Sequence, residues 1–161
     1  MSMLKVLFVC TGNICRSPTA EAVLRQQAAQ AGLAERLSIE SAGLAAYHVG
    51  EPPDRRAQAT AARHGYDMSA LRARQVRPDD IERFDLLVAL DRGHLHALSR
   101  QASLDARDRV VLLMDFAPDV PRGTDVPDPY YGAQAEFERA LAMIEAGCAG
   151  LLAHLRARLP S

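Results

Sequence analysis

Residues 4–18 read LKVLFVCTGNICRSP. The first six of them, residues 4–9, form a short apolar run with β-branched and aromatic side chains, which predicts a buried strand. The strand is expected to end at Cys10, where a polar stretch begins. Ser17 and Pro18 are typical of a helix start, with the serine as N-cap and the proline at the first helical position. A strand, a short loop and a helix in this order indicate the opening unit of an α/β fold.

The rest of the chain continues this alternation. The expected elements are a helix from residue 17 to Gly32, a strand at 37–41, a helix at 54–64, a strand at 84–90, a helix at 93–100, a strand at 110–114 and a last helix with an apolar stripe from Phe137 to Leu159. Strands that alternate with helices predict a parallel sheet with helices on both faces. We therefore expect a single three-layer α/β domain over residues 1–161, built on a four-stranded parallel sheet.

Composition and charge exclude several classes of protein. The net charge is −1, so no global field favours nucleic acid or a membrane surface, and we expect neither as a partner. The first residues lack the basic and apolar regions of a signal peptide, and no apolar run approaches the roughly twenty residues of a membrane helix. The three cysteines, Cys10, Cys15 and Cys148, are too few for a disulfide framework and suit a reducing cytoplasm. Because the five histidines are scattered, we expect no metal site and no cofactor.

The loop between Cys10 and Arg16 has the composition of a phosphate cradle. It can curl so that successive N–H groups point inward, and such a nest in front of a helix N-terminus binds a phosphate dianion. Gly12 allows the tight curvature. The same field favours the thiolate form of Cys10, to which Ser17 can donate a hydrogen bond, and the planar Arg16 guanidinium matches two phosphoryl oxygens. The remaining members of the cradle are Thr11, Asn13, Ile14 and Cys15.

A nucleophile in a phosphate cradle still needs an acid. The leaving phenoxide of tyrosine has a conjugate acid with a pKa of about 10, so its departure without a proton would be slow. A long loop at residues 115–131 is rich in Pro and Asp, and loops of this length are usually functional or disordered. It supplies four candidates, and the residues alone do not choose among Asp115, Asp119, Asp125 and Asp128. Asp128-Pro129 is also a common way to initiate a turn.

Several segments together connect the chain to a known family. They are residues 9–22, Ser41-Ala42-Gly43, Tyr47, residues 50–54, Arg74-Gln75-Val76, Asp91 and Asp128-Pro129-Tyr130-Tyr131. With these segments the chain resembles the low-molecular-weight protein tyrosine phosphatases over essentially its whole length. The resemblance implies a phosphotyrosine phosphatase I-like fold with flavodoxin-like topology, in which the aspartate loop folds over the phosphate loop.

The resemblance also implies roles for individual residues. It assigns Cys10 as nucleophile, Arg16 as transition-state clamp and Asp128 as general acid and then general base, with Ser17 as donor to the thiolate. Asn13 and Ser41 become parts of a network that supports the loop. The residues that wall the cleft and stack on the substrate ring would be Tyr47, Tyr130 and Tyr131. The implied reaction is hydrolysis of phosphotyrosine in proteins, and of small aryl phosphates, through a cysteinyl-phosphate and without a metal.

One departure from the family pattern concerns the support of Asn13. Many relatives carry a histidine in the segment that here reads SALRARQ, residues 69–75, and that histidine supports the loop asparagine. Leu71 stands in its place and cannot form a hydrogen bond, so the support of Asn13 is left open. His64 is one candidate for the role, but nothing in the sequence places it there.

Three other functions compete with this interpretation. A protein-arginine phosphatase on the same scaffold tends to carry threonine at the position of Ile14 and to lack the tyrosine pair. An arsenate reductase would need further redox cysteines, and residues 16–147 contain none. A non-catalytic phosphate-binding or flavodoxin-like module has no need of a cysteine, an arginine and a distant aspartate together.

The physiological substrate is not encoded in these motifs. For the oligomeric state, we expect a monomer.

Overall fold

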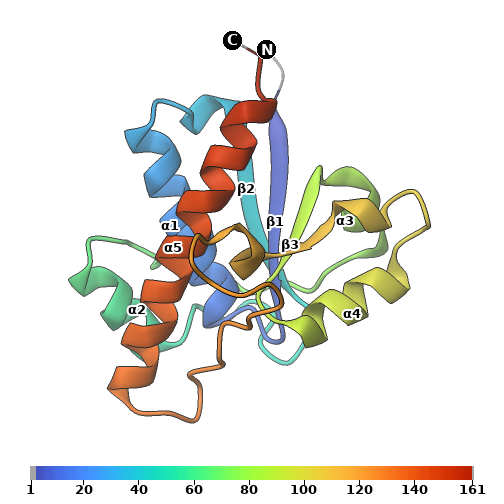
Figure 1. Cartoon of the computed structure of the whole chain (residues 1–161). Helices are drawn as coiled ribbons and strands as arrows, with labels where there is room; N and C mark the ends of the chain where they lie inside the picture. Colours follow the sequence, from blue (N-terminus) through green and yellow to red (C-terminus); the bar gives the residue numbers. More distant parts are fainter. Residues whose placement is uncertain (1–2, 161) are drawn as a thin grey trace.

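A computed structural model describes residues 3–160, and its centre is a sheet of four parallel strands (Figure 1). The strands are β1 (Leu4–Cys10), β2 (Leu37–Gly43), β3 (Leu86–Ala89) and β4 (Val110–Leu112). Their spatial order, β2-β1-β3-β4, is that of a doubly wound, flavodoxin-like sheet. The register places Cys10 opposite Gly43 on β2, so both strands end at the edge of the sheet where such folds bind ligands.

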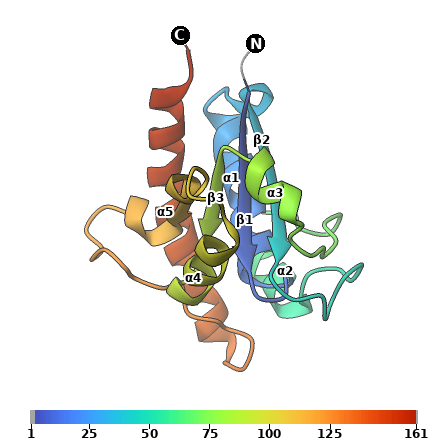
Figure 2. The same ribbon diagram turned by 90° about the vertical axis from the view of Figure 1, so that its right-hand side faces the viewer.

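Helices cover both faces of the sheet, which confirms the predicted three layers. On one face lie α1 (Arg16–Gln30), α2 (Arg55–Arg63) and α5 (Gln134–Arg158), and on the other lie α3 (Pro78–Arg83) and α4 (Arg92–Gln101) (Figure 1 and Figure 2). Short 3₁₀ helices occur at η1 (Ala34–Arg36), η2 (Arg107–Arg109) and η3 (Leu113–Phe116). Each face of the sheet has its own hydrophobic cluster.

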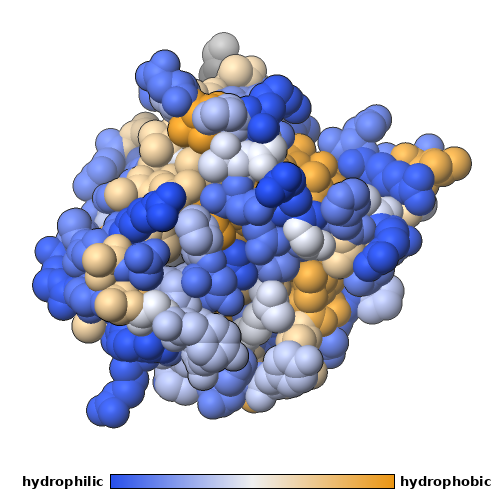
Figure 3. Space-filling view, turned by 60° about the horizontal axis from the view of Figure 1, so that its bottom comes forward, coloured by the Kyte–Doolittle hydropathy of each residue, from blue (hydrophilic) through white to orange (hydrophobic). Residues whose placement is uncertain are grey.

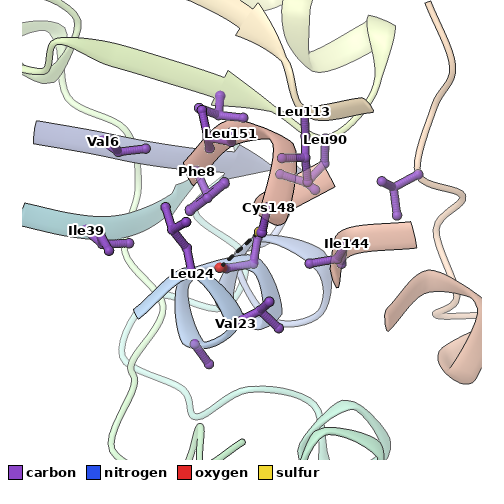
Figure 4. Packing of buried hydrophobic residues seen from close by; sticks show 14 of the residues in the cluster. Val6, Phe8, Val23, Leu24, Ile39, Leu90, Leu113, Ile144, Cys148 and Leu151 are labelled. Atoms are coloured by element: carbon purple, nitrogen blue, oxygen red, sulfur yellow. Dashed lines mark hydrogen bonds between the residues drawn. The ribbon is translucent and has the colours of Figure 1, made fainter. Parts of the chain in front are cut away.

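The larger cluster lies between β1, α1 and α5. Phe8 of β1 and Leu24 of α1 are fully buried there, and Cys148 of α5 packs beside them (Figure 4). The Cys148 thiol lies 3.7 Å from the carbonyl oxygen of Ala20, which accepts its weak hydrogen bond. A Cβ at Gly150 would collide with the backbone of η3, so the glycine allows α5 to approach that turn closely. Cys148 is therefore a core residue, as its place on the apolar stripe predicts.

The last helix, α5, is the one described helix that is long and apolar enough to cross a membrane by length and composition. The larger apolar side chains of α5 lie mostly on the face that the fold buries, and the buried ones are Phe137, Ala140, Leu141, Ile144, Cys148, Leu151 and Leu155. These side chains belong to the larger cluster, together with residues of α1, α2 and the sheet. The buried face of α5 therefore contributes to the core of the domain.

The predicted elements agree with the structure except at several ends and in one helix. The third strand is shorter than expected at both ends, and the fourth ends at Leu112 because the chain turns into η3 at Leu113. Sequence analysis did not predict α3, a helix of six residues with Pro78 at its first position. The fully buried Asp80 carboxylate stabilises its start by accepting the N–H of Arg77 at 2.7 Å. A helix this short offers no apolar period to recognise.

Candidate active site

The loop between β1 and α1 is held from outside through its carbonyl groups. Leu44 donates its N–H to the carbonyl of Cys10 (2.9 Å), Ala45 to that of Thr11 (2.9 Å) and Asp54 to that of Ile14 (2.8 Å). In a trans peptide the N–H points away from the carbonyl of the same unit. The N–H groups of Thr11, Gly12 and Cys15 therefore point to the opposite, concave side of the loop. This arrangement has the geometry of the anion-binding nest that the sequence predicts.

Asn13 takes the left-handed backbone conformation that closes the loop, with φ of 59°. Its N–H donates to Cys10 Sγ at 3.3 Å. Its side chain is held on both ends, because Oδ1 accepts the backbone N–H of Arg74 at 3.0 Å and Nδ2 donates to Ser17 Oγ at 2.8 Å and Ser41 Oγ at 3.0 Å. The predicted link between Asn13 and Ser41 is present in the structure.

Ser17 is not the N-cap of α1, contrary to the expectation from the sequence. The helix begins at Arg16, two residues before the predicted first helical position at Pro18, and its N-cap is Cys15, which makes no side-chain capping bond. The hydroxyl of Ser17 is fully buried and lies 2.9 Å from Cys10 Sγ. The Ser17 side chain therefore contacts a residue of the phosphate loop and does not cap α1. The free N–H groups of the first turn of α1 remain directed at the nest.

Arg16 is buried at the base of the loop and holds two distant segments. Its Nη1 donates to Asp91 Oδ2 at 2.8 Å and to the carbonyl oxygen of Val126 at 2.9 Å. Its Nη2 lies 3.8 Å from Asp128 Oδ2. Asp91 is itself fixed as the N-cap of α4, since its Oδ1 accepts the N–H of His94 at 2.9 Å. These contacts place the aspartate loop over the phosphate loop.

A cleft of about 220 Å³ opens above the loop. Its lining consists of Cys10, Thr11, Gly12, Ile14, Cys15, Arg16, Tyr47, His48, Asp128, Tyr130 and Tyr131. The three tyrosines form the rim. Tyr47 and Tyr131 are 80% and 93% exposed, and the rings of Tyr130 and Tyr131 meet edge to face at 4.9 Å. Figure 3 shows this end of the molecule, where hydrophilic residues cover most of the surface.

The structure separates the four candidate aspartates. Only Asp128 lines the cleft, and its side chain is 48% exposed. Asp125 accepts hydrogen bonds from the backbone and the guanidinium of Arg92, and Asp115 accepts the N–H of Gly123 at 2.9 Å. Asp119 sits at a turn with φ of 62°. Within residues 3–160 no three side chains of the metal-binding types gather closely enough to hold an ion.

Comparison with known proteins agrees with this geometry. The model of the family described as low molecular weight phosphotyrosine protein phosphatase matches residues 5–161. The chain belongs to this family. Its membership confirms the resemblance drawn from the sequence motifs.

Relatives of this phosphatase cover nearly all of its length. A Streptomyces coelicolor protein named low molecular weight protein-tyrosine-phosphatase is 50% identical over 155 residues, which are 94% of this chain and 93% of that protein. The crystal structure of YfkJ from Bacillus subtilis superposes with a TM-score of 0.92 at 38% identity and covers 99% of both chains. Vibrio vulnificus Wzb in complex with benzylphosphonate gives a TM-score of 0.81 at 29% identity, covering 95% of this chain and 99% of Wzb.

This phosphatase supports its loop asparagine without a histidine. Leu71 is half-buried and packs against the larger cluster. The backbone N–H of Arg74 supplies the hydrogen bond to Asn13 Oδ1, so the asparagine does not lack support. His64 does not take the role, because its Nε2 lies 2.7 Å from Glu138 Oε2 on α5. Backbone N–H donors are present in every residue type except proline and leave no mark in a sequence.

Sequence analysis missed His94, which holds the first residue of the phosphate loop. Its Nε2 lies 2.9 Å from Thr11 Oγ1, and Nδ1 lies 3.2 Å from Asp91 Oδ1 without the geometry of a hydrogen bond. Burial, with a contribution from Arg16, lowers the pKa of His94 to about 4, so the ring is neutral at physiological pH. The available signal was its position three residues after Asp91, which follows the third strand.

Proposed function

We propose that the protein hydrolyses phosphotyrosine in proteins, and small aryl phosphates, with Cys10 as nucleophile, Arg16 as phosphate clamp and Asp128 as general acid. The observation that carries this proposal is the convergence of the three side chains on one cleft. Cys10 Sγ accepts the N–H of Asn13 at the base of that cleft, and as a thiolate it can also accept the proton of the Ser17 hydroxyl, 2.9 Å away. Hydrogen bonds of this kind favour a thiolate, which is the nucleophilic form of cysteine.

The reaction has two steps. The Cys10 thiolate attacks phosphorus in line, the bond from phosphorus to the phenolic oxygen breaks, and Asp128 gives its proton to that oxygen. The Asp128 carboxylate then takes a proton from water, the oxygen attacks phosphorus, and the thiolate leaves with release of inorganic phosphate. Arg16 and the inward N–H groups stabilise the negative charge on the equatorial oxygens in both steps.

The walls of the cleft support an aryl substrate. Tyr47, Tyr130 and Tyr131 present aromatic surface on which a phenyl ring can stack, and Ile14 adds an apolar side chain to the floor. Benzylphosphonate, the ligand of the Vibrio vulnificus neighbour, carries a phenyl ring one methylene group away from its phosphorus. These contacts favour phosphotyrosine over phosphoarginine, whose guanidinium would gain less from an apolar wall.

We further propose a cytoplasmic monomer that acts on phosphoproteins as a single domain. The balanced charge supports the absence of nucleic acid and membrane partners. All three cysteines are free and buried, which suits a reducing compartment.

A turnover assay in a metal-chelating buffer tests the proposed function. We expect release of inorganic phosphate from phosphotyrosyl peptides and aryl phosphates, and much slower release from phosphoarginine peptides of the same sequence. Equal or faster turnover of the phosphoarginine peptides would indicate that phosphoarginine, and not phosphotyrosine, is the substrate. No turnover of any of these compounds, in a protein that binds inorganic phosphate, would favour a non-catalytic module.

Replacing the acid is expected to affect substrates according to their leaving groups. In Asp128→Asn, kcat/KM should fall by about 10²–10³-fold for aryl phosphates with basic leaving groups and much less for nitrophenyl phosphates, which need little protonation. We use kcat/KM because it reports the step in which the phenol departs. Asp125→Asn is the matched control, since that carboxylate lies outside the cleft. An equal loss across the whole series would remove Asp128 from the acid role.

The buried thiol of Cys15 is expected to protect the enzyme from peroxide. Burial, followed by the charges of Asp54 and Cys10, raises the pKa of Cys15 far above its usual range, so it is a neutral thiol beside the cleft. Peroxide oxidises Cys10 to a sulfenic acid, which Cys15 can convert to a disulfide with loss of water. A thiol reductant should then restore the wild type but not Cys15→Ser. Cys148→Ser should recover like the wild type, whereas equal recovery of all three proteins would make Cys15 a passive loop residue.

A further inference from the structure

A chain of side-chain hydrogen bonds leads from the nucleophile into the interior. Cys10 Sγ lies 2.9 Å from Ser17 Oγ, and Ser17 Oγ lies 2.8 Å from Asn13 Nδ2. The same Asn13 nitrogen lies 3.0 Å from Ser41 Oγ, which in turn lies 2.6 Å from Glu21 Oε1. All five residues are buried. The chain therefore links the base of the cleft to a carboxylate on the second turn of α1.

With Cys10 as the thiolate, the direction of every bond in this chain follows from counting protons. The backbone N–H of Arg74 can only donate, so it identifies the Asn13 oxygen as the acceptor and the Asn13 nitrogen as the donor. The two protons of that nitrogen go to Ser17 and Ser41. Each hydroxyl has one proton of its own left to donate. Ser17 donates it to Cys10, and Ser41 donates it to the carboxylate beyond.

Glu21 ends the chain as a group that can only accept hydrogen bonds when ionised. Its side chain is 6% exposed, and its second oxygen pairs with Arg25 at 2.7 Å. Burial raises the pKa of Glu21, while the hydrogen bond from Ser41 and the charge of Arg25 oppose the rise. Burial of this carboxylate costs free energy, which the hydrogen bond from Ser41 and the ion pair with Arg25 offset.

We propose that Glu21 is a positioning residue for the nucleophile, because its carboxylate holds the Ser41 proton and so keeps Ser41 as the acceptor that orients Asn13 and Ser17 toward Cys10. Without that acceptor, Ser41 has to turn its proton elsewhere, and one Asn13 proton loses its partner. Asn13 then shifts, and the hydrogen bond from Ser17 to the sulfur lengthens. This inference deepens the proposed function, since it rests on Cys10 as the nucleophile.

The test is Glu21→Gln, which keeps the shape of the side chain. Because Arg25 can only donate, it takes the remaining oxygen of the amide and leaves the amide nitrogen, a donor, facing Ser41. The readout is carboxymethylation of Cys10 by iodoacetate across a pH series, with the modified residue identified by peptide mass spectrometry. We expect the pH midpoint of alkylation to rise by about half a unit or more. We also expect kcat to fall by about tenfold, with a smaller change in KM. Glu40→Gln, which removes a carboxylate of β2 that pairs with Arg74 outside the chain, should leave the midpoint in place.

A double-mutant cycle separates a role through the chain from a merely structural one. Ser41→Ala breaks the chain, so Glu21→Gln should shift the midpoint no further in that background. An equal shift in both backgrounds, or a wild-type midpoint in Glu21→Gln, would overturn the proposal. Because alkylation is measured without substrate, the proposal can fail while turnover remains, and the proposed function can fail while the coupling to Cys10 is confirmed.

Discussion

Cys10→Ser is expected to lower the turnover of aryl phosphates by on the order of 10⁴-fold or more while the protein keeps its fold. A serine hydroxyl at this position is far less ionised than a thiol, so the attacking anion is lost. The side chain is nearly isosteric, and the loop remains held through the carbonyl groups of its backbone. Rates of phosphate release and thermal unfolding of the two proteins provide the measurement.

The controls for this variant use the other two cysteines. Cys15→Ser and Cys148→Ser should retain turnover before any oxidation, because neither sulfur receives the Ser17 hydrogen bond. Cys10→Ser should still bind inorganic phosphate, since the nest and Arg16 are unchanged. Turnover above a trace in Cys10→Ser would contradict the covalent mechanism.

The same variant offers a way to find the physiological substrate. An inactive protein with an intact cradle retains a phosphoprotein that the active enzyme would release. Capture from the lysate of the source organism, with competition by inorganic phosphate as control, should identify a protein that carries phosphotyrosine. Recovery of proteins that carry only phosphoarginine would contradict the assignment of the substrate class.

The fold could be predicted because its signals are local. The segment at residues 4–18 contains a buried strand, a loop and a helix within one short stretch, and Gly32 closes that helix in the left-handed conformation that glycine favours. The limits of β3 and β4 were harder to predict, because the apolar runs there continue into core residues outside the ladder, such as Leu90 and Leu113. A run of apolar residues indicates burial and does not mark where the hydrogen-bonded ladder stops.

The sequence predicts those site residues whose reactive side chains stand close together along the chain. Cys10 and Arg16 stand six positions apart, whereas Asp128 was one of four candidates until the family resemblance selected it. The carbonyl of Val126 and the N–H of Arg74 bind the site through the backbone, which has the same chemistry in every residue except proline. Contacts of this kind depend on how distant elements meet, and no local pattern contains that information.

Arg16→Lys is expected to lower kcat/KM by about 10²–10³-fold although it keeps a positive charge. The guanidinium uses Nη1 for Asp91 and Val126 and still presents Nη2 near Asp128 at the cleft. A lysine ammonium is a single point and cannot hold these protein groups and two phosphoryl oxygens together. Arg63→Lys, at an arginine paired with Glu138 away from the cleft, is the matched control and should have nearly wild-type kinetics.

Comparison with Arg16→Ala divides the role of this residue into two parts. Alanine leaves the Asp91 carboxylate and the buried Val126 carbonyl without their donor, so it should lower the free energy of unfolding by about 1–3 kcal/mol, whereas lysine can still reach one of them. If Arg16 is a clamp, both variants lose most of kcat/KM and only alanine loses much stability. The alternative outcome is that kcat/KM falls only in the variant that loses stability, so that Arg16→Lys is nearly as active as the wild type. In that case Arg16 holds the aspartate loop in place and does not bind the phosphoryl group.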